Sequence, residues 1–383
     1  MARWVPDDRD EFDRPAADIA AMFADAEQRL TAMVALQVRA GLDVGDDPAK
    51  ALRLGELRDL ATRLVAYLRG AAPEQVAALM TTAAEHGTAA ALNELQGLAG
   101  VADAATAATT GSALAAQLAT ADLSSMFDDV TTRILRFPDD VYRRAVGQSV
   151  TDVLLGMGTN RSAQAHAWQR IVSQGVTGFV DKANRRWNLA TYVEMATRTA
   201  ARRAWDDQHT ATMTSHGITL VSLVVGSDGC KACAHWSGKV LRTDAGPTGR
   251  IDVPSTVADG DVTVTVAGTL DEAKHDGWRH PNCRCRQVAY LPGLSVVSDA
   301  TTHDPVLEQQ REKLRDLERK VRKVKLDESA AVTPETKSAA RRKRLDLQRQ
   351  IAAHVRETGL NRKRYREQVS LGRQFIPDGP AGS

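Results

Sequence analysis

All four cysteines of this chain lie between residues 230 and 285, in two short clusters. The first is Cys230-Lys-Ala-Cys233, and the second is His280-Pro-Asn-Cys283-Arg-Cys285. Random placement of four cysteines over 383 residues would rarely confine them in this way. A C-x-x-C pair followed by closely spaced cysteine and histidine is typical of tetrahedral Zn²⁺ sites. The pattern therefore predicts a small module that is cross-linked locally.

Five side chains compete for the four positions around such an ion: Cys230, Cys233, His280, Cys283 and Cys285. The first two can reach one ion from a single tight turn, and His280 and Cys283 repeat the same spacing. Cys285 competes with His280 because the thiolates of a C-x-C pair can also share a metal. We expect a structural zinc, which would supply folding free energy to a module too small for a large core. Spacing alone does not determine whether His280 or Cys285 is the fourth ligand.

Other interpretations of the cysteines stay open at this point, namely a disulfide-bonded cluster or a reduced cluster without metal. A redox C-x-x-C would need a thioredoxin-like βαβ context, which the flanking sequence lacks. A cysteine nucleophile with His235 or His275 as its base would not need a second cysteine cluster. Trp236 and Trp278 flank the clusters, and we expect them to pack over the metal loops.

Composition narrows the class of protein. The formal net charge is +2 and charged residues make up 26% of the chain, so no global charge points to nucleic acid or membrane. Aromatic residues make up only 4%, and alanine-rich helical stretches dominate, which favours a mostly helical fold with a lean core. No window approaches the ~18 apolar residues of a membrane span, and the first residues have no apolar signal core. We expect a reducing cytoplasm, where paired thiols are more often metal ligands or redox centres than disulfides.

Apolar residues at helical spacing predict a helical N-terminal body. Residues 99–122 are rich in Ala, Thr and Gly and fit either a helix or a loose connector. Proline suits the first turn of a helix, so we expect helices to begin at Pro73 and Pro138. The expected helices cover residues 15–45, 48–69, 73–98, 138–155 and 162–214, the last broken near Gly175 and Gly178 and resuming at 189–213.

The pattern changes after residue 217. Runs rich in β-branched residues predict strands at 218–225, 238–242 and 262–266. Residues 243–261 have the Gly, Pro and Asp content of an exposed loop. The module at 217–293 is therefore expected to be α+β.

A basic helical tail follows from about Pro305. Heptad spacing and an N-cap at Thr333-Pro334 predict a helical hairpin or a coiled coil that ends before Gly359. Two basic clusters lie on it, Arg341–Arg344 and Arg362–Arg366. The apolar positions are Leu307, Leu314, Leu317, Val321 and Val324 in the first helix and Leu347, Ile351 and Val355 in the second.

The fold class expected from these patterns is mainly α: a helical N-terminal body, a small α+β zinc-knuckle-like module, and a C-terminal helical hairpin or coiled-coil tail. The expected parts are a body at 1–160, a helical connector at 161–216, the module at 217–293, the basic tail at 305–370 and a disordered end at 371–383.

Three runs of the module carry a family resemblance: Cys230 to Cys233, Trp236-Ser-Gly-Lys-Val-Leu241, and His280 to Cys285. They resemble the signature of Mu-F-like minor head proteins of tailed phages, and are most similar to the minor capsid protein family of actinobacterial siphophages. Upstream, 175–180 and 186–200 match as well, and weaker similarity covers most of the chain. Related sequences often carry His at the place of Cys285, which implies that this position can bind a metal. The stretch 243–261 looks longer than is usual for the family.

The resemblance implies a low-copy structural protein without enzymatic activity, in the interior of the phage head at the portal vertex, that assists head morphogenesis or DNA delivery. It would pass through the host cytoplasm during assembly. Implied partners are the portal protein and the major capsid or scaffold protein, with no membrane. The basic tail would suit scaffold, portal or packaged DNA, and equally a solvated helix surface.

Two other function classes remain. Mu-F-like modules are sometimes fused to toxins such as ADP-ribosyltransferases or nucleases, but no toxin-sized domain with a catalytic constellation follows residue 293. A zinc-containing nucleic-acid-binding module would need a basic surface near the knuckle. Acidic residues dominate there: Asp228, Asp244, Asp252, Asp259, Asp261, Asp271 and Asp276.

Overall fold

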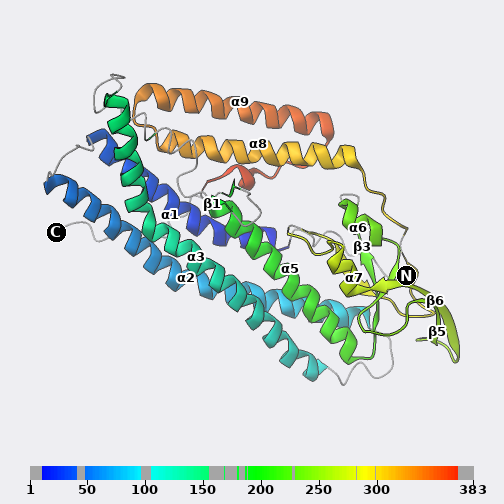
Figure 1. The fold of residues 1–383 in the computed structure, drawn as a ribbon. Coiled ribbons are helices and arrows are strands. Elements are labelled where there is room, and N and C mark those ends of the chain that lie inside the picture. The colour runs from blue at the N-terminus through cyan, green and yellow to red at the C-terminus, as the bar shows by residue number, and fades with distance from the viewer. Residues whose placement is uncertain are drawn as a thin grey trace. The chain divides into compact units, whose positions relative to one another are not determined.

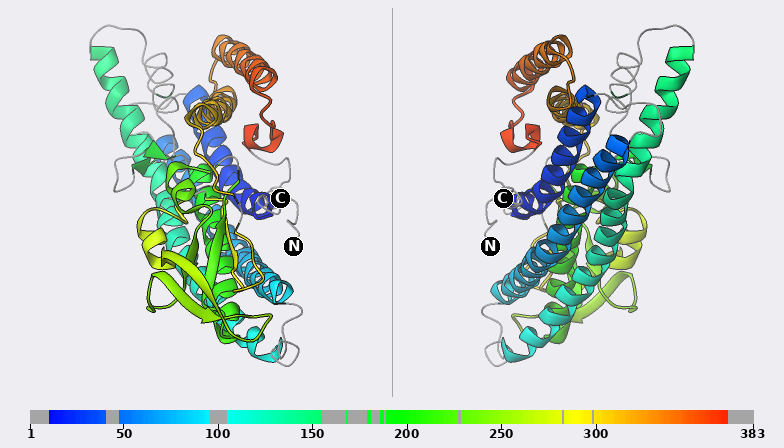
Figure 2. Two further views of the ribbon diagram at one scale, coloured as in Figure 1. Left: turned by 90° about the vertical axis from the view of Figure 1, so that its right-hand side faces the viewer. Right: turned by 90° about the vertical axis from the view of Figure 1, so that its left-hand side faces the viewer.

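The protein is described by a computed structural model, drawn in Figures 1 and 2. It describes residues 11–40, 48–95, 105–154, 168, 179–180, 186–187, 189–226, 229–281, 283–297 and 299–369. Most of these residues are helical, and a small mixed sheet lies between α5 and α8 in the sequence, so the mainly α fold class is confirmed. The expected disordered end at 371–383 lies outside the described residues.

The helices include three long ones in the N-terminal half and two in the C-terminal tail. They are α1 (Asp13–Ala40), α2 (Pro48–Glu94), α3 (Ala105–Leu154), α5 (Leu189–Ser215), α6 (Lys231–Trp236), α7 (Leu270–His275), α8 (Pro305–Ser329), α9 (Pro334–Thr358) and the 3₁₀ turn η3 (Arg364–Glu367). None of the helices in the described ranges is long and apolar enough to cross a membrane.

The described residues divide into two compact units. One draws on Met1–Ala16, Pro73–Ser124 and Met195–Glu308, and the other on Ala17–Ala72, Ser125–Glu194 and Gln309–Ser383. The division of the chain near residues 160, 216 and 293 stays a prediction.

Both expectations about proline in the N-terminal half are wrong. Pro73 lies inside α2 and Pro138 lies inside α3, so neither starts a helix, and the expected helices at 48–69 and 73–98 belong to one helix. An interior proline removes one backbone hydrogen bond and costs about 3 kcal/mol. In α2 the side chain of Pro73 is exposed, while the buried positions Leu68, Ala72 and Val76 continue through it at helical spacing. Burial of that apolar face outweighs the local preference for a break.

Residues 105–122, which fitted either helix or connector, form the first part of α3. Within 162–214, the expected piece at 189–213 is confirmed as α5. The strands β1 (Phe179–Val180) and β2 (Arg186–Trp187) pair antiparallel between the expected break near Gly178 and the start of α5, where no strand was predicted. Aromatic and β-branched residues there favour an extended backbone.

Helices α8 and α9 lie side by side as a hairpin (Figure 1). Four of the five predicted apolar positions of α8 pack against Leu347 and Ile351 of α9, namely Leu314, Leu317, Val321 and Val324, and both Val321 and Ile351 are fully buried. The fifth, Leu307, is not part of this cluster. Thr333 caps the start of α9, with Pro334 in its first turn, and Gly359 ends the helix at φ 70°. Glycine adopts that left-handed conformation without the steric cost of a Cβ. The predicted boundaries of this hairpin are confirmed.

The module contains a five-stranded sheet in the order β5-β6-β4-β3-β7. Its strands are β3 (Leu220–Val224), β4 (Val240–Arg242), β5 (Gly249–Pro254), β6 (Asp261–Thr269) and β7 (Arg286–Ala289). The three predicted strands are confirmed as β3, β4 and β6. The stretch 243–261 is not only a loop, because β5 pairs with β6 along its whole length. The alternation in Arg250-Ile-Asp-Val253 was the available signal for this strand.

Pairing β3 with β7 determines where the two cysteine clusters lie. These strands are antiparallel, with Val224 opposite Arg286. The chain leaves β3 toward Cys230 and enters β7 from Cys285, so the end of one strand lies beside the start of the other. Two clusters about fifty residues apart in the sequence, as Cys233 and Cys283 are, therefore meet at the same end of the sheet.

Candidate metal centre

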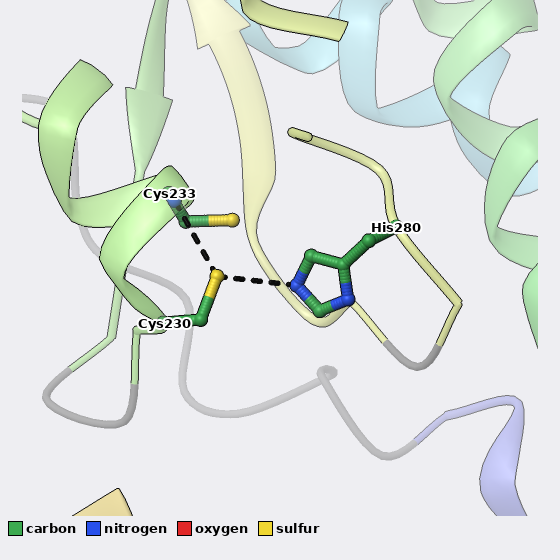
Figure 3. A group of neighbouring side chains, drawn as sticks. All are labelled: Cys230, Cys233 and His280. Carbon is green, nitrogen blue, oxygen red and sulfur yellow. Dashed lines mark hydrogen bonds between the residues drawn. The ribbon is translucent and has the colours of Figure 1, made fainter. Parts of the chain in front are cut away.

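The first cluster lies at the N-terminus of α6. Cys230 is the N-cap residue, and the backbone amide of Cys233 donates a hydrogen bond to its Sγ at 3.4 Å. The same turn of helix brings the Cys233 side chain back over Cys230, which is half-buried, while Cys233 is fully buried. The close-up view shows the Cys230 sulfur between the Cys233 amide and the His280 ring (Figure 3).

The second cluster follows α7. Trp278 is buried in the core, and Arg279 adopts a left-handed backbone conformation at φ 63° that turns the chain. The amide of Cys283 donates to the carbonyl of His280 at 2.9 Å, closing a tight turn that presents both side chains to the same side. Cys285 is buried one residue before β7 begins.

Two distances between the clusters are close to the edges expected of a tetrahedral metal site. Cys230 Sγ lies 3.2 Å from His280 Nε2, and Cys233 Sγ lies 3.6 Å from Cys283 Sγ. With Zn–S near 2.3 Å and Zn–N near 2.0 Å, tetrahedral geometry places sulfurs about 3.8 Å apart and sulfur and nitrogen about 3.5 Å apart. Both observed separations are close to these edges. No disulfide joins the four thiols, which are all free.

Two groups of three potential ligands share Cys233. One is Cys230, Cys233 and His280, and the other is Cys233, Cys283 and Cys285; within each, all ligand atoms lie within 4.8 Å of one another. All five residues singled out in the sequence are therefore brought together, and these Cys/His groups could hold a metal ion.

The ring of His280 is oriented for coordination through Nε2. Its Nδ1 lies 2.8 Å from the carbonyl oxygen of Pro281, which can only accept a hydrogen bond. Nδ1 therefore carries the proton, and the lone pair of the neutral ring is on Nε2, the atom that faces Cys230. Such a hydrogen bond to the second ring nitrogen is what commonly fixes the tautomer of metal-binding histidines.

The electrostatics of the cluster favour charged ligands. Hydrogen bonds, first from Cys233 and then from His280, lower the pKa of Cys230 to about 4. A hydrogen bond with Cys233 also holds the pKa of Cys283 far below that of a free thiol. The hydrogen bond with Cys230 raises the pKa of His280 to about 10. The polypeptide thus stabilises two thiolates before any cation is considered, and a bound metal would replace the His280 proton.

The pKa of the two remaining thiols moves in the opposite direction. Hydrogen bonds, first with Cys230, raise the pKa of Cys233. A hydrogen bond with Cys233 lowers the pKa of Cys285, but Cys283 and burial outweigh it, and the net shift is upward. Four thiolates in so small a volume would repel one another, so without a cation only part of the cluster ionises.

Apolar packing encloses the cluster. Trp236 and Trp278 are both buried in the core that contains Cys233 and Cys285. This agrees with the prediction that they pack over the two segments that carry the cysteines. The two histidines considered as catalytic bases lie elsewhere. His235 packs edge-on against Trp236, and His275 is exposed at the end of α7.

Sequence reasoning missed the arginines that anchor the second cluster to the helices. Arg279 donates to Asp207 at 2.7 Å and to the backbone carbonyl of Arg203 at 2.9 Å, both on α5, and its Nε lies 3.4 Å from Asp206. Arg284, between Cys283 and Cys285, donates to the buried Asp13 at 2.7 Å. The signal in the sequence was three arginines, at 279, 284 and 286, beside the ligands of an otherwise acidic module.

Asp206 is the most unusual of these partners. It is fully buried, and neither carboxylate oxygen takes part in a hydrogen bond within the described part of the chain. Burial raises its pKa to about 6, against the lowering effects of Arg279 and Arg202. Arg279 is therefore the main counter-charge that keeps this carboxylate ionised.

The comparisons with known proteins identify one family. The model of phage minor capsid protein 2 matches residues 8–356, which is most of the chain. Neither a curated protein nor a solved structure matches it. The matched range contains the helical body, the Cys/His cluster and nearly all of the α8–α9 hairpin. The chain therefore belongs to the phage minor capsid protein 2 family.

Proposed function

We propose that the protein is a low-copy structural component of a tailed-phage head, associated with the portal vertex, that assists head assembly or DNA packaging and delivery. The observation that carries the proposal is the family match over residues 8–356. The portal protein and the major capsid or scaffold protein are the proposed partners. An amphipathic hairpin and a small α+β module fit a protein that works by contact with other chains.

Quantitative mass spectrometry of purified particles tests this role. We expect the protein in heads at a copy number far below that of the major shell protein, and its loss from particles assembled without portal. Absence from mature and immature heads alike, or a copy number near that of the shell protein, would contradict the portal-vertex assignment.

We further propose that the module at 217–293 holds one structural zinc through Cys230, Cys233, His280 and Cys283. The hydrogen bond from His280 Nδ1 to Pro281 supports His280 as the fourth ligand, because it leaves Nε2 free to face the thiolates. Cys285 is then a buried neighbour of Cys233 and Cys283. Four protein ligands leave no position for water, so the ion would stabilise the fold and supply no chemistry.

Elemental analysis of protein purified without chelator should give about one zinc per chain. The matched pair His280→Ala and Cys285→Ser separates the two ligand sets. We expect the first variant to lose most of its metal and the second to keep it. The opposite result would make Cys285 the ligand. Less than about a tenth of an equivalent in the wild-type protein, with no loss of stability on adding chelator, would exclude the structural metal.

An enzymatic toxin or nuclease is the alternative of another class. The four protein ligands proposed above would leave no open position for water, which argues against metal-dependent hydrolysis at this centre. ADP-ribosylating or nuclease activity that a single side-chain change abolishes would replace the structural proposal.

A further inference from the structure

We propose that the outward face of α9 binds the phosphate backbone of duplex DNA through a row of three arginines, Arg342, Arg349 and Arg356. This proposal concerns a surface remote in sequence from the metal ligands and does not depend on the metal.

The three arginines repeat every seven residues, so they lie on one side of the helix. All three are exposed, whereas Leu347, Ile351 and His354, on the opposite side of α9, are buried. At about 1.5 Å per residue, neighbouring arginines of the row are about 10.5 Å apart and the whole row spans about 21 Å. That length is roughly two thirds of a DNA turn of about 34 Å.

The charge of this face is neutralised only in part by the described residues of the protein itself. Among the residues that the structure describes, Arg342 and Arg356 make no ion pair or side-chain hydrogen bond. Arg349 pairs with Asp346 at 3.3 Å, but both side chains remain mostly exposed. These guanidinium groups are therefore available to a partner.

The second basic cluster of the tail is different. Arg362 makes two hydrogen bonds to the buried Glu367, at 2.6 and 2.8 Å. Arg322 donates to the backbone carbonyl of Arg366, and Lys325 donates to Gln368 at 2.7 Å. In the first cluster, Arg344 likewise pairs with Glu328 at 2.8 Å. Arg322, Lys325 and the Arg344–Glu328 pair connect α8 to the later part of the tail, and Arg362 pairs within that part. The basic residues of the tail therefore form an internally paired set and an outward-facing set.

Phosphate is the partner that this face fits best. Arginine offers paired N–H donors that match phosphate oxygens, and a regular row of such groups suits a polymer with regularly spaced charges. A protein partner would need an apolar centre at the contact. Leu345 is the one large apolar side chain of α9 in the described range that is clearly exposed, at 47%. The face therefore favours DNA over a protein surface.

The test is the salt dependence of binding by the full chain to a fluorescent 20-base-pair duplex of random sequence. Each phosphate contact contributes about 0.9 to the slope of log affinity against log salt, so the triple variant Arg342→Gln/Arg349→Gln/Arg356→Gln should lower the slope by about 3. The matched control is Arg63→Gln/Arg136→Gln/Arg250→Gln. Those arginines are also exposed and have no side-chain partner among the described residues.

We expect the control to bind as the wild type does, and both variants to keep the wild-type unfolding midpoint. An equal loss in the control would show binding by general charge and overturn the proposal. So would an unchanged slope in the α9 variant, or no binding by the wild-type protein at low salt. Competition by poly-glutamate as effective as that by unlabelled duplex would assign the face to an acidic protein surface instead.

Discussion

The module at 217–293 and the α8–α9 hairpin are stabilised in different ways. Around its cysteines the module has a core of ten buried residues, of which two are cysteines and two are tryptophans. Ion pairs at Arg279 and Arg284 add to that small core. The hairpin instead repeats one kind of contact, an apolar seam from Leu314 to Val324 against Leu347 and Ile351. With the proposed metal bound, stability would be concentrated at a few atoms in the module, whereas in the hairpin it is distributed along the seam.

The difference determines how each region should respond to a single change. Removing one ligand from a metal centre abolishes the contribution of the whole centre, because its members act together. Removing one seam residue leaves a cavity whose cost is local. The predictions below test this contrast from the largest expected effect to the smallest.

Cys233→Ser should have the largest effect, because Cys233 belongs to both groups of potential ligands. We expect loss of the metal and of cooperative unfolding in the module, since a structural zinc site can contribute about 10 kcal/mol or more. Metal analysis combined with hydrogen exchange in β3 and β7 measures both. Exchange in α9 should not change. If the variant keeps its metal, or if hydrogen exchange becomes as much faster in α9 as in β3, the stability of the module does not depend on this one site.

Arg279→Ala should cost about 3–5 kcal/mol, because it leaves the fully buried Asp206 without its main counter-charge. Chemical denaturation followed by hydrogen exchange in α5 measures the loss. The double variant Arg279→Ala/Asp206→Asn should recover part of it, since a neutral amide costs less to bury than an unpaired carboxylate. If the double variant is less stable than the single one, Asp206 stabilises the protein through an interaction other than its ion pair with Arg279.

Ile351→Ala should cost about 2–5 kcal/mol, the usual range for a large-to-small change at a fully buried position. The loss should appear as faster hydrogen exchange in α8 and α9, with the metal content unchanged. Leu345→Ala is the matched control in the same helix, because that side chain is half exposed and outside the seam. Equal losses in the two variants would mean that the seam does not hold the hairpin.

The same contrast explains how much could be predicted from the sequence. The hairpin is specified by local signals: heptad spacing, the Thr333-Pro334 cap and the Gly359 stop all act within a few residues of the boundaries they define. The five metal-site candidates were also found locally, from their spacing.

What the sequence did not reveal depends on contacts between distant residues. The pairing of β3 with β7 joins segments about sixty residues apart, and β5 is a strand because β6 lies beside it. Arg279 reaches Asp207 across 72 positions. Pro73 and Pro138 mislead for a related reason, because the buried face of each helix continues past the local break signal. Tertiary packing overrides local propensity at these positions.

Thr333→Ala should lower the stability of the protein least of all these changes. It removes one local polar contact from the hairpin, whose stability otherwise comes from the apolar seam, and so tests whether the hairpin depends on any single contact. The Thr333 hydroxyl accepts from the amide of Thr336 at 3.3 Å, and the Thr336 hydroxyl lies 3.2 Å from the amide of Thr333. Losing an N-cap of this kind costs about 1 kcal/mol. We expect faster hydrogen exchange in the first turn of α9 alone. Ser338→Ala, an exposed change one turn later, should have no such effect, because alanine is the better helix former and Ser338 takes no part in the cap. Loss of protection along all of α8 and α9 in the Thr333 variant would show that the hairpin, too, depends on a single point.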